Sequence, residues 1–414
     1  MDNVQHEIDQ LYKAHFGRIV ASLLYSSRDI DPETAEDIVH DAFSTAITHW
    51  RMHGVPLNSK AWIYKVCKNK ALNILSRSKR QNNTSEDVAD IAAVEQKFSE
   101  SLLNDQPLAL LFACAHPDLS PKAQVVVTLK YVVNFKVEAI AKILGMTIDG
   151  IDKLLLRARQ KIKDETIILE EPETSSLTPR LPIVHKILYL LFNEGYKSSW
   201  GKQVMREDLC EEALTMTKIL IDSPLGNKDT AALFSLMLFN SARFKSRFSP
   251  TGELLDLEKQ DRSLWEKNLI MLGCEYLTRS QCDVISTYHL EASIACVHCS
   301  ANCFEETDWN TIASLYSKLL NDNSNPFVEL NFAIALYYCG RREETFEILD
   351  RLHSHPFLSQ YYLLNTTLGK FHHLEGNDSL AKEFLTKAMQ QTNFIDERRF
   401  IQRMMDGIDG KSGV

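Results

Sequence analysis

Three cysteines in the segment CVHCSANC are the side chains of this sequence that most resemble metal ligands. Cys296, Cys299 and Cys303 are three and four positions apart, so a helix would bring them to one face. Zinc is held by thiolates and imidazoles, and His289 and His298 lie nearby. Three ligands on one helix still need a fourth from elsewhere, and buried cysteine also serves as a small apolar residue at close helix contacts. We therefore predict packing cysteines, with no metal and no cofactor.

A second cluster with chemical potential is NEGY, from Asn193 to Tyr196, where an amide, a carboxylate and a phenol adjoin. A hydrogen-bonded turn that ends a helix at Gly195 explains the same residues equally well. No phosphate-binding loop, serine-nucleophile elbow, HExxH pair or other catalytic constellation occurs in the chain. We therefore predict a protein that is not an enzyme.

The segment WIYKVCKNKALNILSRSKR, from Trp62 to Arg80, carries an unusual charge pattern. The chain has a formal net charge of -9 over 414 residues, yet no Asp or Glu occurs from Ala42 to Ser85. A helical projection gives the segment one apolar arc and an opposite arc with cations, two amides and an aromatic ring. The predicted core arc is Ile63, Tyr64, Cys67, Ala71, Leu72, Ile74 and Leu75.

The opposite arc has the side chains that a nucleic acid requires. Cations neutralise phosphates, amides read base edges, and an aromatic ring stacks on an exposed base. An ordinary wet face that happens to be basic is the alternative. The predicted DNA contacts are Trp62, Lys65, Asn69, Lys70, Asn73 and Arg77.

Just upstream, the segment DIDPETAEDIVHDAF is acidic. Asp31 is a suitable N-cap before Pro32, and acids in a first helical turn suit the helix dipole. Asp41 lies beyond the first helical turn, so neither capping nor the helix dipole explains it. The acidic face could therefore dock a basic protein partner.

These chemical groups must be positioned by helices, because helical periodicity dominates the chain. We predict an all-α fold of two or three domains. The chain has no run of 18 apolar residues and no signal pattern, so we expect a cytoplasmic protein without membrane contact. Nine cysteines, an odd number, are expected as reduced thiols. The predicted boundaries are a helical module at 1–82, a linker at 83–105, a helix-turn-helix module at 106–166, a linker at 167–180 and a C-terminal module at 181–414.

In the middle module, Gly145 falls between two helical patterns at the place where a helix-turn-helix needs its tight turn. The following helix ends in basic residues but begins with Asp149, Gly150 and Asp152. Carboxylates there weaken phosphate attraction, so we expect weak duplex binding. A three-helix packing unit without DNA contact is the alternative. The predicted contacts are Lys153, Arg157 and Arg159.

The C-terminal module contains a weak repeat. Small and apolar residues recur at the offsets of tetratricopeptide helix pairs, where close helix packing favours them. An irregular helical bundle with coincidental spacing is the alternative. The copies run through Leu368, Gly369, Gly376, Ala381 and Ala388, through Ala333, Leu336 and Gly340, and, more poorly, through Ala313 and Leu320.

The segment AEDIVHDAF, then Trp50, GVP and AWIYKVCKNKALN resemble region 2 of the extracytoplasmic-function sigma factors of bacterial RNA polymerase. The resemblance implies that the acidic helix binds core polymerase. It also implies that the following loop and basic helix bind the −10 promoter element and trap an unstacked base. Asn73 and Ser76 depart from the residues usual in that family. The implied polymerase contacts are Glu36, Asp37, His40, Asp41 and Phe43.

Residues 119–162 resemble sigma region 4, which reads the −35 element. The segments RLPIVHKILYLLFNEGYKSS, LEKQDRSLW and TDWNTIASLY resemble the tetratricopeptide-like extension of one sigma-factor subgroup. This implies a subunit that directs core RNA polymerase to promoter DNA, with an extension that governs activity and receives a signalling protein or a ligand. The alternative is a helix-turn-helix repressor or activator with a repeat-based sensor, which would not need polymerase.

Overall fold

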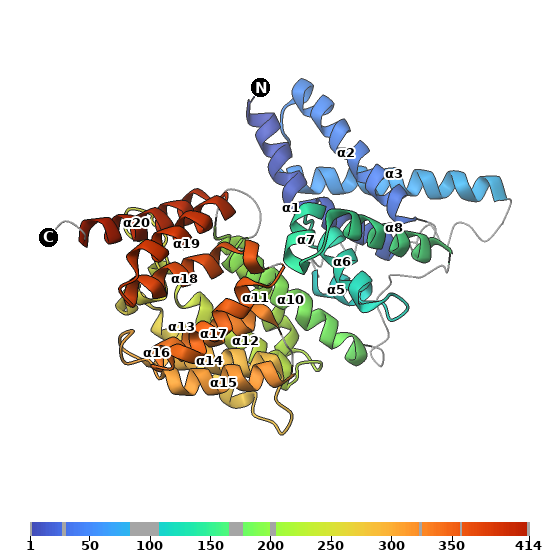
Figure 1. Cartoon of the computed structure of the whole chain (residues 1–414). Coiled ribbons are helices and arrows are strands. Elements are labelled where there is room, and N and C mark those ends of the chain that lie inside the picture. Colours follow the sequence, from blue (N-terminus) through green and yellow to red (C-terminus); the bar gives the residue numbers. More distant parts are fainter. Residues whose placement is uncertain are drawn as a thin grey trace. The chain divides into compact units, whose positions relative to one another are not determined.

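The computed structural model describes residues 2–26, 30–82, 107–164, 177–198, 204–322, 325–356 and 358–411 (Figure 1). Across these ranges the regular secondary structure is helical, apart from an isolated antiparallel bridge between Phe248 and Leu254, so the all-α prediction is confirmed. In the same ranges no helix is long and apolar enough to cross a membrane. The predicted linker 83–105 and residues 167–176 of the second linker lie outside them.

Two compact units make up the chain, Met1–Leu191 and Phe192–Val414. The division falls inside helix α10 (Leu181–Tyr196), later than the predicted start of the C-terminal module at 181. The end of the second predicted linker is already ordered by the first unit. Thr178–Arg180 form a short 3-10 helix, and Arg180 is buried with its guanidinium 2.7 Å from the carbonyl oxygen of Phe112.

The first unit begins with α1 (Asp2–Ser26), α2 (Pro32–His53) and α3 (Ser59–Asn82). The start of α2 is as predicted, because the Asp31 carboxylate accepts a 2.8 Å hydrogen bond from the backbone N–H of Thr34, and Pro32 opens the first turn. Gly54, with a φ of 81°, ends the helix. The apolar stripe of α2 is buried at Ala35, Ile38, Val39, Ala42, Phe43, Ala46 and Trp50.

Helix α3 turns most of its predicted core arc inward. Leu72 is half-buried and Ile74 is 38% exposed, so the prediction was wrong for Ile74. The physical reason is that α3 packs on α1 and α2, which cover a narrower strip of its surface than the projected arc. The residues confirmed in the core are Ile63, Tyr64, Cys67, Ala71 and Leu75.

The middle of the chain forms α5 (Pro107–Cys114), α6 (Pro121–Tyr131), α7 (Val137–Leu144) and α8 (Ile148–Asp164). Gly145 adopts a left-handed conformation with φ 61° and ends α7, which confirms the predicted tight turn. Helices α6 and α7 both pack on α8. This is the arrangement of a helix-turn-helix, with α8 as the last helix.

The α5–α8 module packs against α1 within the first unit. A Cβ added at Gly17 of α1 would lie 2.5 Å from the carbonyl oxygen of Tyr131, so glycine is required for this approach. Asn134, with a positive φ of 60°, donates from its side-chain amide to the carbonyl oxygen of Tyr12 over 3.4 Å. These two contacts bring residues more than a hundred positions apart together.

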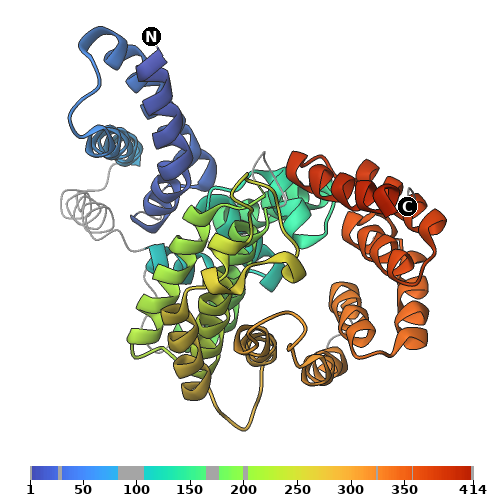
Figure 2. The same ribbon diagram turned by 90° about the vertical axis from the view of Figure 1, so that its left-hand side faces the viewer.

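The second unit is a succession of helices joined by short turns, with one longer irregular segment after α12. The orange and red helices follow one another in Figure 2, and each packs chiefly on its neighbours in sequence. The elements are α11 (Glu207–Asp222), α12 (Lys228–Ser241), η2 (Phe244–Ser246), η3 (Leu257–Lys259), η4 (Arg262–Leu264), α13 (Lys267–Arg279), α14 (Thr287–Ser300), α15 (Trp309–Asp322), α16 (Pro326–Tyr338), α17 (Arg342–His353), η5 (Leu358–Gln360), α18 (Tyr362–Leu374), α19 (Asp378–Gln391) and α20 (Ile395–Lys411).

Helical hairpins occur at two of the predicted repeat copies. Gly340 turns between α16 and α17 with φ 81°, and Gly376 turns between α18 and α19 with φ 82°. A Cβ added at Gly369 would lie 2.7 Å from Cγ of Leu385, so the second hairpin depends on a small residue at its crossing. The predicted packing residues Ala333, Leu336, Leu368, Ala381 and Ala388 are buried, and so is Ala313, whereas Leu320 of the poorer copy is half-buried and Leu319 takes the core position.

The motif LEKQDRSLW serves packing in this unit. The guanidinium of Arg262 donates to the carbonyl oxygens of His298 (2.8 Å) and Ala301 (2.9 Å) at the end of α14, and to the hydroxyl of Thr307 (3.0 Å). The buried indole N–H of Trp265 donates to the Ser246 hydroxyl over 2.7 Å. The motif therefore holds the irregular segment against α14.

Candidate nucleic-acid interface

The predicted DNA-contacting face of α3 is present as a surface. Lys65, Asn69, Asn73 and Arg77 are exposed along the helix, one or two turns apart. Trp62 is half-buried, with its ring 5.2 Å from the ring of His49 and 5.4 Å from that of Trp50. The residue most suited to stacking is thus held in position by α2.

Lys70 differs from the other cations of this face. Its ammonium lies 2.6 Å from the Asp41 carboxylate of α2, and its side chain is 29% exposed. Sequence reasoning assigned Lys70 to DNA and Asp41 to polymerase, and the structure pairs the two. The positive charge of Lys70 is therefore largely neutralised in this conformation.

The acidic face of α2 is divided by its packing. Asp37, His40 and Asp41 are exposed, so these predicted polymerase contacts form a surface. Phe43 is 4% exposed and packs its ring 5.1 Å from that of Tyr12, so it supports the helix and presents no contact surface. The structure therefore removes Phe43 from the predicted polymerase contacts, because this residue belongs to the buried stripe of α2.

The end of α2 and the loop after it expose apolar side chains that sequence reasoning did not single out. Met52, in the last turn of α2, is 69% exposed, and Leu57, in the loop after the Gly54 turn, is fully exposed. Single exposed apolar side chains are common on protein surfaces and do not by themselves mark a binding site. The sequence signal for this exposure was GVPLN, which places a leucine among turn-forming residues.

On α8 the three predicted contacts have different environments. Arg157 is exposed, and Lys153 is exposed but forms a 2.6 Å pair with Asp149 one turn earlier. The hydroxyl of Thr147 accepts from the backbone N–H of Gly150, which orders the weak start of the helix. Leu156 adds an apolar group between the cations, since it is 64% exposed.

Arg159 faces the first helices of the unit. Its Nη2 lies 2.9 Å from the Glu36 carboxylate, and its Nε donates to the hydroxyl of Tyr131 over 2.6 Å. Burial raises the pKa of Tyr131 to about 12, with the nearby Glu36 charge adding to the effect. Burial pulls the pKa of Arg159 down, but Tyr131 and Glu36 outweigh it, and the net direction is upward. A predicted −35 contact and a predicted polymerase contact are thus joined to each other.

The NEGY cluster of the C-terminal unit is explained by packing. Glu194 is buried and accepts a 3.0 Å hydrogen bond from Ser198, and the ring of Tyr196 lies 4.0 Å beneath the guanidinium of Arg247. A Cβ at Gly195 would lie 2.7 Å from the sulfur of Cys210. Among the described residues no group of three or more His, Cys, Asp or Glu is arranged to hold a metal ion.

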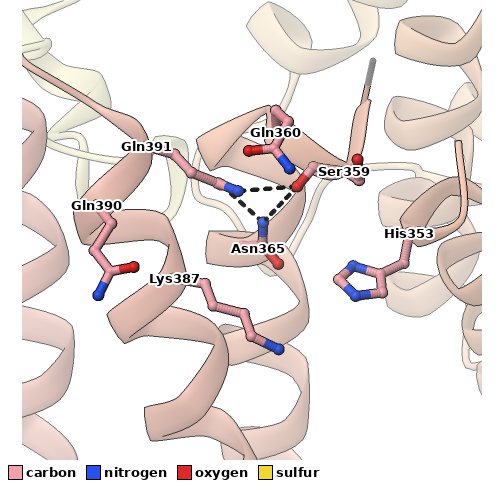
Figure 3. A pocket seen from close by; sticks show the side chains of 7 residues that line it. All are labelled: His353, Ser359, Gln360, Asn365, Lys387, Gln390 and Gln391. Atoms are coloured by element: carbon pink, nitrogen blue, oxygen red, sulfur yellow. Dashed lines mark hydrogen bonds between the residues drawn. The ribbon is translucent and has the colours of Figure 1, made fainter. Parts of the chain in front are cut away.

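A polar hollow of about 410 Å³ lies among α17, η5, α18 and α19 (Figure 3). The amide N–H of Asn365 donates to Gln391 over 2.8 Å, while its carbonyl oxygen is buried without a hydrogen-bond partner among the described residues. Figure 3 shows this oxygen on the side of Lys387 and His353. The hollow has the hydrogen-bonding groups for a small polar molecule and no nucleophile paired with a base.

Comparison with known proteins shows which families parts of the chain resemble. Residues 109–162 match the family Sigma-70, region 4, and residues 180–281 match a family of unknown function (DUF6596). The uncharacterized protein R00370 of Rhizobium meliloti (strain 1021) is 26% identical over 394 residues, which cover 94% of this chain and 92% of the relative. No solved structure matches the chain.

The all-helical chain therefore contains, within α5–α8, a segment that matches a sigma-70 region 4 domain. The match to region 4 implies sigma-factor-like binding of promoter DNA and RNA polymerase. The extension that follows is similar to a family without an assigned function.

Proposed function

We propose that the chain is a non-enzymatic sigma factor of the extracytoplasmic-function type, in which the α1–α3 bundle is region 2. One observation carries the proposal. A carboxylate-free face of cations, amides and an aromatic ring on α3 adjoins an acidic face on α2, and both precede a region 4 domain in the same chain. A duplex-binding repressor needs neither the acidic face nor a second DNA-binding face.

In this proposal the exposed acids Asp37 and Asp41 dock α2 on core polymerase. Lys65, Asn69 and Arg77 then hold the −10 strand, with Trp62 positioned to stack on an unpaired base. Sequence recognition at −35 falls to α8, where Arg157 is an exposed cation.

The same proposal requires the two DNA-binding modules to separate. Elements centred at −10 and −35 are about 25 base pairs apart, or roughly 85 Å at about 3.4 Å per base pair. The 2.9 Å contact between Arg159 and Glu36 cannot persist across that span. The packed first unit is therefore a resting form, and promoter binding follows its opening.

The second unit is proposed to be a tetratricopeptide-like extension that governs activity. Its support is the pair of glycine-turned hairpins and the neighbour-to-neighbour packing of α15–α20. The polar hollow among α17, α18 and α19 is a place where a ligand could act. A chain ended after Tyr196 keeps the whole first unit, and unchanged promoter activity of this variant would exclude an essential regulatory role.

Run-off transcription with core polymerase and genomic DNA tests the proposal. We expect promoter-specific transcripts with the wild-type chain, and about a tenfold loss in the double variant Lys65→Ala/Arg77→Ala, because two phosphate contacts are removed. Lys122→Ala is the matched control, since this lysine is exposed on α6 away from the proposed faces. Absence of transcripts together with failure to co-purify with core polymerase would favour the repressor.

A further inference from the structure

The cysteines of this chain gather in its second unit. Seven of the nine lie after residue 191, at 210, 274, 282, 296, 299, 303 and 339, and all of the nine are free thiols. Three of the seven lie on α13 and α14, and Cys282 and Cys303 lie in the turns that follow these helices. A function in transcription does not call for thiols, so their arrangement needs its own account.

Two of these thiols face each other across a helix pair. The sulfur atoms of Cys274 on α13 and Cys296 on α14 are 4.0 Å apart, at van der Waals contact. Both residues are half-exposed, so small oxidants reach them, and α13 packs directly on α14. A disulfide needs a sulfur separation of about 2.05 Å, which rotations of two neighbouring cysteine side chains can supply.

The remaining cysteines of the region have other surroundings. Cys299, on the same helix as Cys296, is directed to the carbonyl oxygen of Phe239 at 3.9 Å. The exposed Cys282 donates to the carbonyl oxygen of Val284 over 2.9 Å. Cys296 has in addition the Ser300 hydroxyl at 3.9 Å, a weak contact that does not compete with the facing thiol.

We propose that Cys274 and Cys296 form a reversible disulfide site, oxidised by hydroperoxides. One thiolate attacks the peroxide, its sulfur becomes a sulfenic acid, and the O–O bond breaks to release an alcohol or water. The second thiolate then attacks that sulfur, the S–S bond forms, and hydroxide leaves as water after protonation. Two thiols and one hydroperoxide thus give one disulfide, one water and one alcohol, or two waters when the oxidant is hydrogen peroxide.

Oxidation that begins at Cys296 is slow at neutral pH. Burial, with the neighbouring Cys274 adding to it, raises the pKa of Cys296 to about 11. Since the thiolate is the nucleophile, attack by this sulfur accelerates as pH rises toward that value. A thiol reductant restores both thiols.

The test uses the full-length protein with hydrogen peroxide as the oxidant. After treatment, free thiols are blocked with N-ethylmaleimide, and a non-reducing digest is analysed by mass spectrometry. We expect a peptide pair linked through Cys274 and Cys296, formed faster at pH 9 than at pH 7 and lost after dithiothreitol. The linkage should also raise the midpoint of thermal unfolding, because it closes a loop across α13 and α14.

Variants test which cysteines form the disulfide. Cys274→Ser and Cys296→Ser abolish the linked peptide, whereas Cys282→Ser, which removes the most exposed thiol nearby, leaves it at wild-type yield. The wild-type measurement stands even where a variant folds poorly. Full N-ethylmaleimide labelling of both residues after oxidation, or a dominant link between other cysteines, would overturn the proposal without touching the sigma-factor assignment.

Discussion

The contact between α8 and the first helices can be broken without altering any side chain assigned to DNA or polymerase. Tyr131→Phe removes the α6 hydroxyl that accepts the 2.6 Å hydrogen bond from Arg159, so the guanidinium that reaches Glu36 of α2 is held less firmly while the buried ring keeps its place. Gly17→Ala acts on the other side of the contact, because its Cβ would lie 2.5 Å from the backbone oxygen of Tyr131. Both changes favour the opened first unit.

The magnitude follows from Gly17→Ala. Adding a methyl group to a close-packed contact costs about 1–3 kcal/mol, and this cost falls on the packed form because the Cβ meets a backbone oxygen of the other module. The ratio of opened to packed forms then rises by about 5–150-fold. Tyr131→Phe should give a smaller shift in the same direction, because the hydrogen bond that it removes joins α6 to α8 within one module.

Two measurements report this shift. Small-angle scattering of a chain ended after Tyr196 should show a larger radius of gyration, and anisotropy should show tighter binding to a −35 duplex, up to the same factor. Tyr64→Phe is the matched control, because Tyr64 is buried in the α1–α3 bundle with its hydroxyl 3.4 Å from Nδ1 of His15 on α1. If Tyr131→Phe and Gly17→Ala lower stability but leave size and duplex affinity at control values, the packed unit is not a resting form.

Three further predictions concern single residues. Lys65→Ala should reduce the slope of log affinity against log salt by about 0.7 in titrations with single-stranded −10 DNA, whereas Lys70→Ala should change it little because a carboxylate already neutralises it; equal slopes would contradict this. Arg262→Lys should lower the free energy of unfolding, measured in urea, by about 2–4 kcal/mol, because lysine cannot remake all the hydrogen bonds to two carbonyls and a hydroxyl. Lys259→Ala, at an exposed lysine, should change this free energy by less than about 0.5 kcal/mol. Burial and, to a smaller extent, two nearby arginines lower the pKa of His298 to about 3. Below about pH 6.5 the unfolded chain therefore binds a proton on this imidazole, whereas the folded chain does not. The free energy of unfolding should therefore fall by up to about 1.4 kcal/mol per pH unit between about pH 6.5 and 5, and His298→Gln should remove this component; a slope unaffected by the substitution would refute the assignment.

Local features of the fold were predictable because they depend on residues adjacent in sequence. Asp31 and Pro32 start α2 through a cap and a fixed φ, and Gly145 and Gly340 end helices where only a left-handed conformation continues the chain. The basic arc of α3 was predictable for a similar reason, since a helix of known period needs only the order of its side chains. Ile74 shows the limit, because its exposure depends on how wide a strip the neighbouring helices cover.

The contacts that alter the proposed site were not predictable in this way. Arg159 and Glu36 are 123 positions apart, and neither carries a local signal that it will meet the other. The three hydrogen bonds of Arg262 likewise follow from how an irregular segment crosses α14. The sequence marks these residues as charged and places them on helices or turns, but tertiary packing decides whether a charge faces solvent, DNA or another side chain.

Two ion pairs between helices of the first unit each join a residue assigned to polymerase with one assigned to DNA. Lys70 is neutralised by Asp41, and Arg159 by Glu36. Under the proposed function, polymerase competes for the carboxylates, so its binding releases the cations for phosphate. Linkage makes the effect reciprocal, because DNA that binds the cations frees the carboxylates for polymerase by the same free energy. Free protein would then bind promoters poorly, and specificity would arise only in the complex, for which an acidic chain with neutralised cations is well suited.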